Sequence, residues 1–138
     1  TDIVMMLNGA LAGLVAITAE PLTPGPITAM VIGSIGAVIM YYGTKLLESL
    51  GLDDVVGAIP VHMFAGIFGT LVVPLTNGDT SFGTQFIGVI SVCIFSFVLS
   101  WITFSALKST VGLRISKAAE KQGTDKAEVG VVAYSIRD

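Results

Sequence analysis

The sequence has 138 residues, of which 53% are hydrophobic and 12% charged, and its mean hydropathy is +0.86. Soluble domains carry about a quarter charged residues, so this composition excludes an ordinary soluble domain. The formal net charge of −3 argues against a nucleic-acid partner, which favours a basic surface. The single cysteine, Cys93, leaves no disulfide framework and no cysteine cluster for a metal ion.

Four apolar runs follow one another along the chain, at residues 3–19, 27–44, 55–75 and 86–107. A membrane-spanning helix needs about 20 residues, with about 17 as the lower limit. The runs are separated by a proline-rich break at 20–26, a mixed charged and leucine-rich segment at 45–54, and a polar break at 76–80. We predict an all-α, polytopic transmembrane bundle in residues 1–108, followed by a polar tail in residues 109–138.

The basic residues predict the orientation of this bundle. Lys45 lies in the second connector, the other six basic residues lie from Lys108 onward, and the first and third connectors contain none. Short loops rich in lysine and arginine stay on the cytoplasmic side. We therefore expect a multi-pass protein of the cell membrane, with both the Thr1 end and the C-terminal tail in the cytoplasm.

Small residues recur at helical spacing within the first three runs. Lipid supplies no hydrophobic drive for helix association, so membrane helices use such positions to bring their backbones close together. The sequence predicts a tightly packed bundle through Gly9, Gly13, Gly33, Ala37, Gly66 and Gly69.

His62 is the only histidine, and it lies inside the third apolar run. An ionisable group at membrane depth is costly and points to function. A neutral imidazole has one donor and one acceptor, which suits proton relay or hydrogen bonding to a small polar solute. The alternative is a structural hydrogen bond to a neighbouring helix. A metal site is the weakest hypothesis, because no second ligand lies at suitable spacing on that run.

Two features just before His62 have local consequences. Asp54 and its neighbour Asp53 are placed to cap the start of the helix. Pro60 removes one helical hydrogen bond and is expected to kink the helix at Gly57. The carbonyl of Val56 must then find another partner or line a cavity. Asn8 in the first run is interpreted as a packing hydrogen bond.

The tail predicts short ordered pieces. Ser116 is expected to cap a helix that ends at Gly123, and Asp125 with Glu128 forms a weaker capping pattern. Such a tail either docks on the membrane-side surface or is solvated and mobile. The whole sequence contains no phosphate-binding glycine loop, no His-Glu-x-x-His and no serine elbow, so we predict no enzyme and no cofactor.

Several ordered segments of the chain resemble the Amt/Mep/Rh family of ammonium transporters. They are residues 8–18 (NGALAGLVAIT), 52–54 (LDD), 60–70 (PVHMFAGIFGT) and 111–116 (VGLRIS). The tail adds Glu120, Gly123, Asp125, Glu128, Gly130 and Tyr134. The likeness covers essentially the whole chain and corresponds to the C-terminal portion of the family, helices eight to eleven with the cytoplasmic tail. Because the chain starts at Thr1 without an initiator methionine, we expect a fragment of a longer protein.

The resemblance implies a homotrimer in which each protomer moves ammonium or ammonia through its own narrow hydrophobic pore. His62 matches the second of two pore histidines, and the earlier helices that carry the first are absent from this sequence. The tail of this family couples the protomers and contacts a PII-type signalling protein. The resemblance implies the same roles for the tail of this chain, at Arg114, Glu120, Gly123, Asp125 and Tyr134. The segment is expected not to conduct ammonium by itself.

The sequence departs from the family at two positions near the histidine. Gly57 stands where an acidic residue is frequent, and Met63 stands where glycine is common, which leaves the pore width open. Two other functions remain possible at this stage. One is the membrane module of an ammonium sensor with a signalling domain further along the chain, and the other is a membrane scaffold in which His62 only joins helices.

Overall fold

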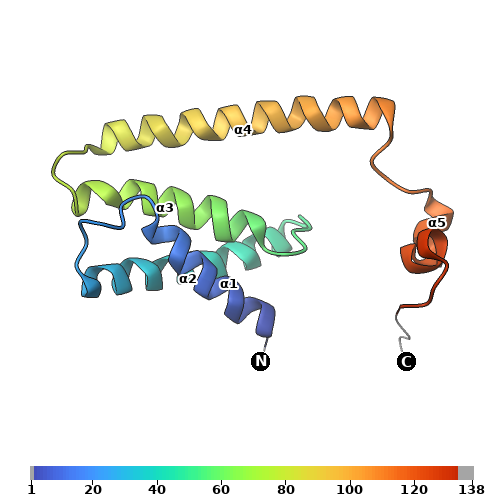
Figure 1. Cartoon of the computed structure of the whole chain (residues 1–138), viewed down its shortest axis with the longest axis horizontal. Coiled ribbons are helices and arrows are strands. Elements are labelled where there is room, and N and C mark those ends of the chain that lie inside the picture. The colour runs from blue at the N-terminus through green and yellow to red at the C-terminus, as the bar shows by residue number, and fades with distance from the viewer. Residues whose placement is uncertain (1, 134–138) are drawn as a thin grey trace. The chain divides into compact units, whose positions relative to one another are not determined.

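The computed structural model describes residues 2–133, and within them every regular element is a helix (Figure 1). The prediction of an all-α fold is therefore confirmed. The elements in chain order are α1 (Ile3–Ile17), α2 (Pro26–Ser49), η1 (Ile59–Phe64), α3 (Ala65–Val72), η2 (Val73–Leu75), α4 (Phe82–Thr110), α5 (Lys117–Gln122) and η3 (Asp125–Val129). The chain divides into two units, Thr1–Cys93 and Ile94–Asp138.

The helix starts follow from local sequence. The Asp2 side chain accepts a hydrogen bond from the Met5 N–H at 3.1 Å, which caps α1. Pro26 opens α2, where its missing N–H has no helical partner to lose. Of these helices, α2 and α4 are long and apolar enough to cross a membrane, whereas α1 and the run Ile59–Leu75 are apolar but shorter.

The third apolar run differs from its prediction at the beginning. Helix starts at Ile59, not at residue 55, so Pro60 occupies the first turn. A proline there leaves no hydrogen bond unmade within the helix, and the predicted kink was wrong. The second connector also differs, because α2 continues to Ser49 and includes Lys45, which lies 4.6 Å above the ring of Tyr41.

The core of the first unit is where α1, α2 and the η1–α3 run pack against one another. Its core cluster combines alanines with two larger apolar side chains. Ala12 and Ala65 are 0% exposed, and Met40 and Val61 are 2% exposed. Small side chains at the centre allow three helices to meet without a large space between them.

Glycines place the backbones of these helices in direct contact. A methyl group on Gly13 would lie 3.2 Å from the carbonyl oxygen of Gly33, and one on Gly36 would lie 2.6 Å from Cβ of Ala16. A methyl group on Gly69 would collide with the carbonyl oxygen of Ala16. The predicted close packing is confirmed at Gly13, Gly33 and Gly69, whereas an added methyl on Gly9 or Gly66 would meet only a side-chain atom at 3.7 Å. Gly36 was not among the predicted positions.

The first and third connectors meet at one end of the bundle. The side-chain amide of Asn77 donates to Glu20 Oε2 at 2.8 Å, and the Asp79 N–H donates to Asn77 Oδ1 at 3.0 Å. The bond from Asn77 holds the pKa of the Glu20 carboxyl below its usual value. The two breaks predicted to share one side of the membrane are therefore joined to each other.

The contact of Gly69 with α1 gives a direct test of this packing. We expect Gly69→Ala to lower the free energy of unfolding of the detergent-solubilised protein by about 1–3 kcal/mol, because the added methyl separates tightly packed helices. Gly66→Ala is the matched control, since its methyl would meet only Val15 Cγ1, at 3.7 Å. Equal stability of the two variants would contradict the close approach of α1 and α3.

Candidate functional site

Asp54 closes the start of the helix that carries His62. Its Oδ1 accepts a hydrogen bond from the Ala58 N–H at 2.9 Å, and its Oδ2 accepts one from the Ile59 N–H at 2.7 Å. These two N–H groups have no partner within the helix, and a carboxylate there also faces the positive end of the helix dipole. Asp54 therefore fixes the first turn with both of its oxygens.

Gly57 provides the backbone turn between this cap and the helix. Its φ is +72°, a conformation that L side chains rarely adopt. Its N–H donates to the carbonyl of Asp54 at 3.1 Å, and its own carbonyl accepts from the Val61 N–H at 3.1 Å. Gly57, where the resemblance led us to expect an acidic residue, thus has a structural use in this chain.

The carbonyl of Val56 receives a hydrogen bond from another helix. The side-chain amide of Asn8, in α1, donates to it at 3.0 Å. Pro60, which follows at the usual helical distance, has no N–H to offer this carbonyl. Of the two predicted outcomes, a new partner or a cavity, the structure shows the partner, which is Asn8.

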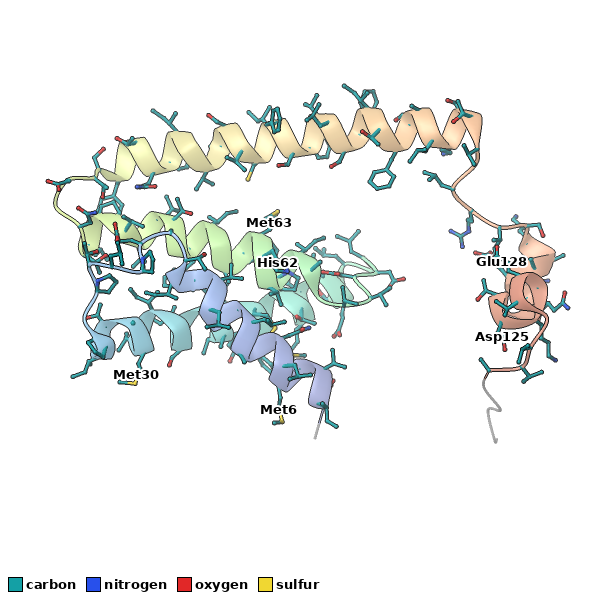
Figure 2. All side chains as sticks on the ribbon, in the orientation of Figure 1. Met6, Met30, His62, Met63, Asp125 and Glu128 are labelled. Carbon is teal, nitrogen blue, oxygen red and sulfur yellow. The ribbon has the colours of Figure 1, made fainter. Side chains whose placement is uncertain are left out.

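His62 follows this turn as the fourth residue of η1, near the start of the helix run (Figure 2). Its neighbours Pro60 and Val61 are buried, whereas the side chain of His62 is exposed and Met63 is 46% exposed. Within residues 2–133 the imidazole has no hydrogen-bond partner, so the structural bond to another helix of this chain is not found. The buried face of the helix passes through Val61 and Ala65, which turns His62 away from α1 and α2.

A cavity of about 210 Å³ lies beside the capped turn. Its lining combines the end of α2, at Thr44 and Glu48, with Asp54, Gly57 and Pro60. His62 is not part of the lining. Among the described residues no group of His, Cys, Asp or Glu could hold a metal ion.

The second unit contains the predicted tail helix. The Ala119 N–H donates to Ser116 Oγ at 3.2 Å, and α5 ends at Gly123, whose φ is +95°. Both predicted ends of this helix are therefore confirmed. Arg114 Nη2 forms an ion pair with Glu120 Oε1 at 2.6 Å, which ties the segment before α5 to its first turn.

Asp125 has a different role from the predicted capping pattern. The residue that precedes η3 is Thr124, which makes no side-chain cap, so the pairing of Asp125 with Glu128 was wrong. Instead, Asp125 Oδ2 accepts a hydrogen bond from the Ala133 N–H at 2.9 Å. That bond, with further backbone N–H groups, holds the pKa of the Asp125 carboxyl below its usual value of 3.8. Tyr134 lies outside the described residues.

The predicted site residues therefore fall into two separate groups. Asp54 and His62 belong to the first unit, at the start of one helix. Arg114, Glu120, Gly123 and Asp125 belong to the second unit, where each contributes to the local structure of the tail. Pro60 indicated that the carbonyl before His62 lacks its helical donor, but the sequence did not identify Asn8 as the residue that bonds to it.

Two of these apolar helices, α2 and α4, are long enough to cross a membrane, and α1, α2 and α3 meet at small residues, an arrangement typical of α-helical membrane proteins. The profile of the Ammonium Transporter Family matches residues 1–134. The chain belongs to this family.

Three relatives give the extent of the match. Ammonium transporter Amt2 of Archaeoglobus fulgidus is 40% identical over 96% of this chain, and Amt2 of Methanocaldococcus jannaschii is 35% identical over 96%. An ammonium transporter of Corynebacterium glutamicum is 31% identical over 94%. The aligned parts are 33%, 34% and 32% of those proteins, so the chain spans about a third of the length of these relatives.

The cap of Asp54 predicts a stability difference between two adjacent aspartates. We expect Asp54→Ala to lower the free energy of unfolding in detergent by about 1–2 kcal/mol, the usual cost of losing an N-cap. Asp53→Ala is the control, because Asp53 accepts no hydrogen bond in the described part of the chain, and its effect should stay within about 0.5 kcal/mol. A larger loss for Asp53→Ala would refute this assignment of the cap.

The bond of Asp125 predicts a pH dependence of the tail. Since the folded tail lowers the pKa of this carboxyl, its stabilisation is present above pH 3.8 and is lost as the pH falls through the lower folded value. We expect the protection of the Ala133 amide against hydrogen exchange to fall in that acid range. Asp125→Asn should weaken the protection at neutral pH, whereas Glu128→Gln should leave it unchanged. Protection that is the same in wild type and Asp125→Asn would count against the bond.

Proposed function

We propose that this chain is part of a transporter that moves ammonium or ammonia across the cell membrane through a hydrophobic pore lined by His62. The observation that carries the proposal is an exposed imidazole on a helix whose other face is tightly packed. Membership of the Ammonium Transporter Family supports ammonium or ammonia as the substrate. The names of the relatives are those of transporters, and no observation favours the sensor.

The surroundings of His62 support the proposal that its side chain faces a passage and not the packed interior of these helices. An imidazole has polar nitrogens that lipid cannot satisfy. Within the described residues the imidazole has no hydrogen-bond partner, which leaves it free to bond to a solute in a polar passage or to a helix outside this sequence. Its neighbours there are apolar, with Ile59 38% and Met63 46% exposed. An apolar wall with one polar group suits a small solute such as ammonia.

The imidazole offers ammonia two kinds of hydrogen bond. In its neutral form one ring nitrogen donates and the other accepts, which is what a neutral molecule with both a lone pair and N–H groups requires. A charged ammonium ion would have to give up much of its hydration to enter an apolar passage. We therefore place His62 at a step where ammonia is bound, with the proton handled separately.

The rest of the arrangement is proposed on the basis of the family. All four apolar runs cross the membrane, and the segment beginning at Lys108 lies in the cytoplasm, where the basic residues gather. Helices outside this sequence complete the pore, and three protomers form the transporter. The tail that contains Arg114, Glu120, Gly123 and Asp125 would contact a PII-type signalling protein.

Transport by the complete transporter in liposomes tests the role of His62. We expect His62→Ala to change ammonium transport by tenfold or more, about 1.4 kcal/mol in the barrier, or to admit other cations such as potassium. Thr70→Val is the matched control, because the hydroxyl of Thr70 donates only within its own helix, to Gly66 at 2.9 Å. Transport and selectivity of His62→Ala equal to wild type, with reduced stability, would show that the histidine is only structural.

A further inference from the structure

We propose that Asn8 is a positioning residue for His62, which it holds in place across two helices through the carbonyl of Val56. The inference rests on the proposed role of His62 in transport. It concerns a residue on a different helix, 48 positions away from the carbonyl that it binds.

The bond joins a side chain of α1 to the backbone of the segment that precedes η1. Asn8 is half-buried in α1, among residues such as Leu7 and Leu11 whose side chains point outward. Its amide donates to Val56 at 3.0 Å. Pro60, four residues further on, has no N–H to offer this carbonyl, so the bond from Asn8 replaces the one that a helix would otherwise supply. It attaches the segment before His62 to α1 at one defined point.

The turn held by this bond has little freedom of its own. Gly57 is adjacent to the bound carbonyl and has a φ of +72°. A methyl group added to Gly57 would lie 2.6 Å from Nδ2 of Asn8, which shows that the amide fits directly against the glycine backbone. Asp54 holds the same turn from the other side through Ala58 and Ile59. Asn8 is the only side chain of another helix that hydrogen-bonds to this turn within residues 2–133.

A short path of fixed geometry leads from the turn to the imidazole. Val61 donates to the carbonyl of Gly57 at 3.1 Å, and Val61 is 2% exposed. His62 is the next residue. Because no flexible segment lies between Val56 and His62, a displacement of the turn is passed on to the imidazole. Without the bond from Asn8, the turn at Val56 and Gly57 loses its only hydrogen bond to α1 within the described residues, while the core contact of Val61 and the contact of Gly69 with Ala16 still hold the helix itself.

The first measurement reports the position of residue 62 without using transport. In the complete protein with Cys93→Ser, a cysteine is placed by His62→Cys or, at the far end of the same helix, by Thr70→Cys. The labelling rate of each cysteine by a water-soluble maleimide is then compared with Asn8 intact and with Asn8→Ala or Asn8→Asp. Asn8→Asp keeps the shape of the side chain but removes the donor.

We expect both Asn8 variants to change the labelling rate at position 62 by roughly fivefold, the factor that an ordinary hydrogen bond is worth, and to leave position 70 unchanged. Thr18→Val is the control on α1, because the hydroxyl of Thr18 bonds only locally, to Val15 at 2.7 Å. Unchanged labelling at position 62 would overturn the proposal. Equal changes at both positions would also overturn it, since they would show general loosening.

The second measurement connects the position to transport. Ammonium transport is measured for Asn8→Ala, for His62→Ala and for the double variant. If Asn8 acts through His62, Asn8→Ala reduces transport several-fold when His62 is present and has little further effect in His62→Ala. Independent effects would overturn this step. Failure of the proposed function is seen separately, as wild-type transport by His62→Ala, and the labelling at position 62 still decides the role of Asn8.

Discussion

The close approach of α1 to both α2 and the η1–α3 run is the constraint on which the rest of the first unit depends. It is possible because Ala16 meets Gly36 on one side and Gly69 on the other, where a larger side chain would collide with the backbone. Leucines or isoleucines at these positions would give as much apolar surface but would keep the helices apart. Lipid is as apolar as such side chains, so the gain here comes from contact between closely fitting surfaces.

This spacing also determines which polar groups can meet. The amide of Asn8 has a short reach, and it contacts the carbonyl of Val56 only because α1 lies directly against the start of η1. At the opposite end of α1, the same approach brings Glu20 within 2.8 Å of Asn77. Small residues in the middle of α1 and polar bonds near both of its ends therefore support one another.

Much of this could be predicted from residue types whose effect is local. Ser116 and Gly123 define α5, because a side-chain cap and a glycine with positive φ act within one turn. Pro60 indicated a free carbonyl because a proline always lacks an N–H. The sequence did not reveal that the helix starts only at Ile59. The apolar residues Val55 and Val56 extend the hydrophobic run, whereas Gly57 and the oxygens of Asp54 decide where the helix begins. Nor did spacing reveal Gly36, since its importance depends on which face of α2 meets Ala16.

The exposed side chain of His62 needs a neighbour that can form hydrogen bonds with its two ring nitrogens. Acyl chains have neither donors nor acceptors, so an imidazole facing lipid would lose both of its hydrogen bonds. The packed face of the same helix, at Val61 and Ala65, has no space for it, because Ala65 is 0% exposed. What remains is a polar passage or a polar group from outside these residues. If His62 bonds to a neighbouring helix, its substitution lowers stability. If His62 faces a passage, its substitution alters selectivity. The anchoring of this turn by Asn8 matters most in the second case, because the position of the ring then decides which solute is bound.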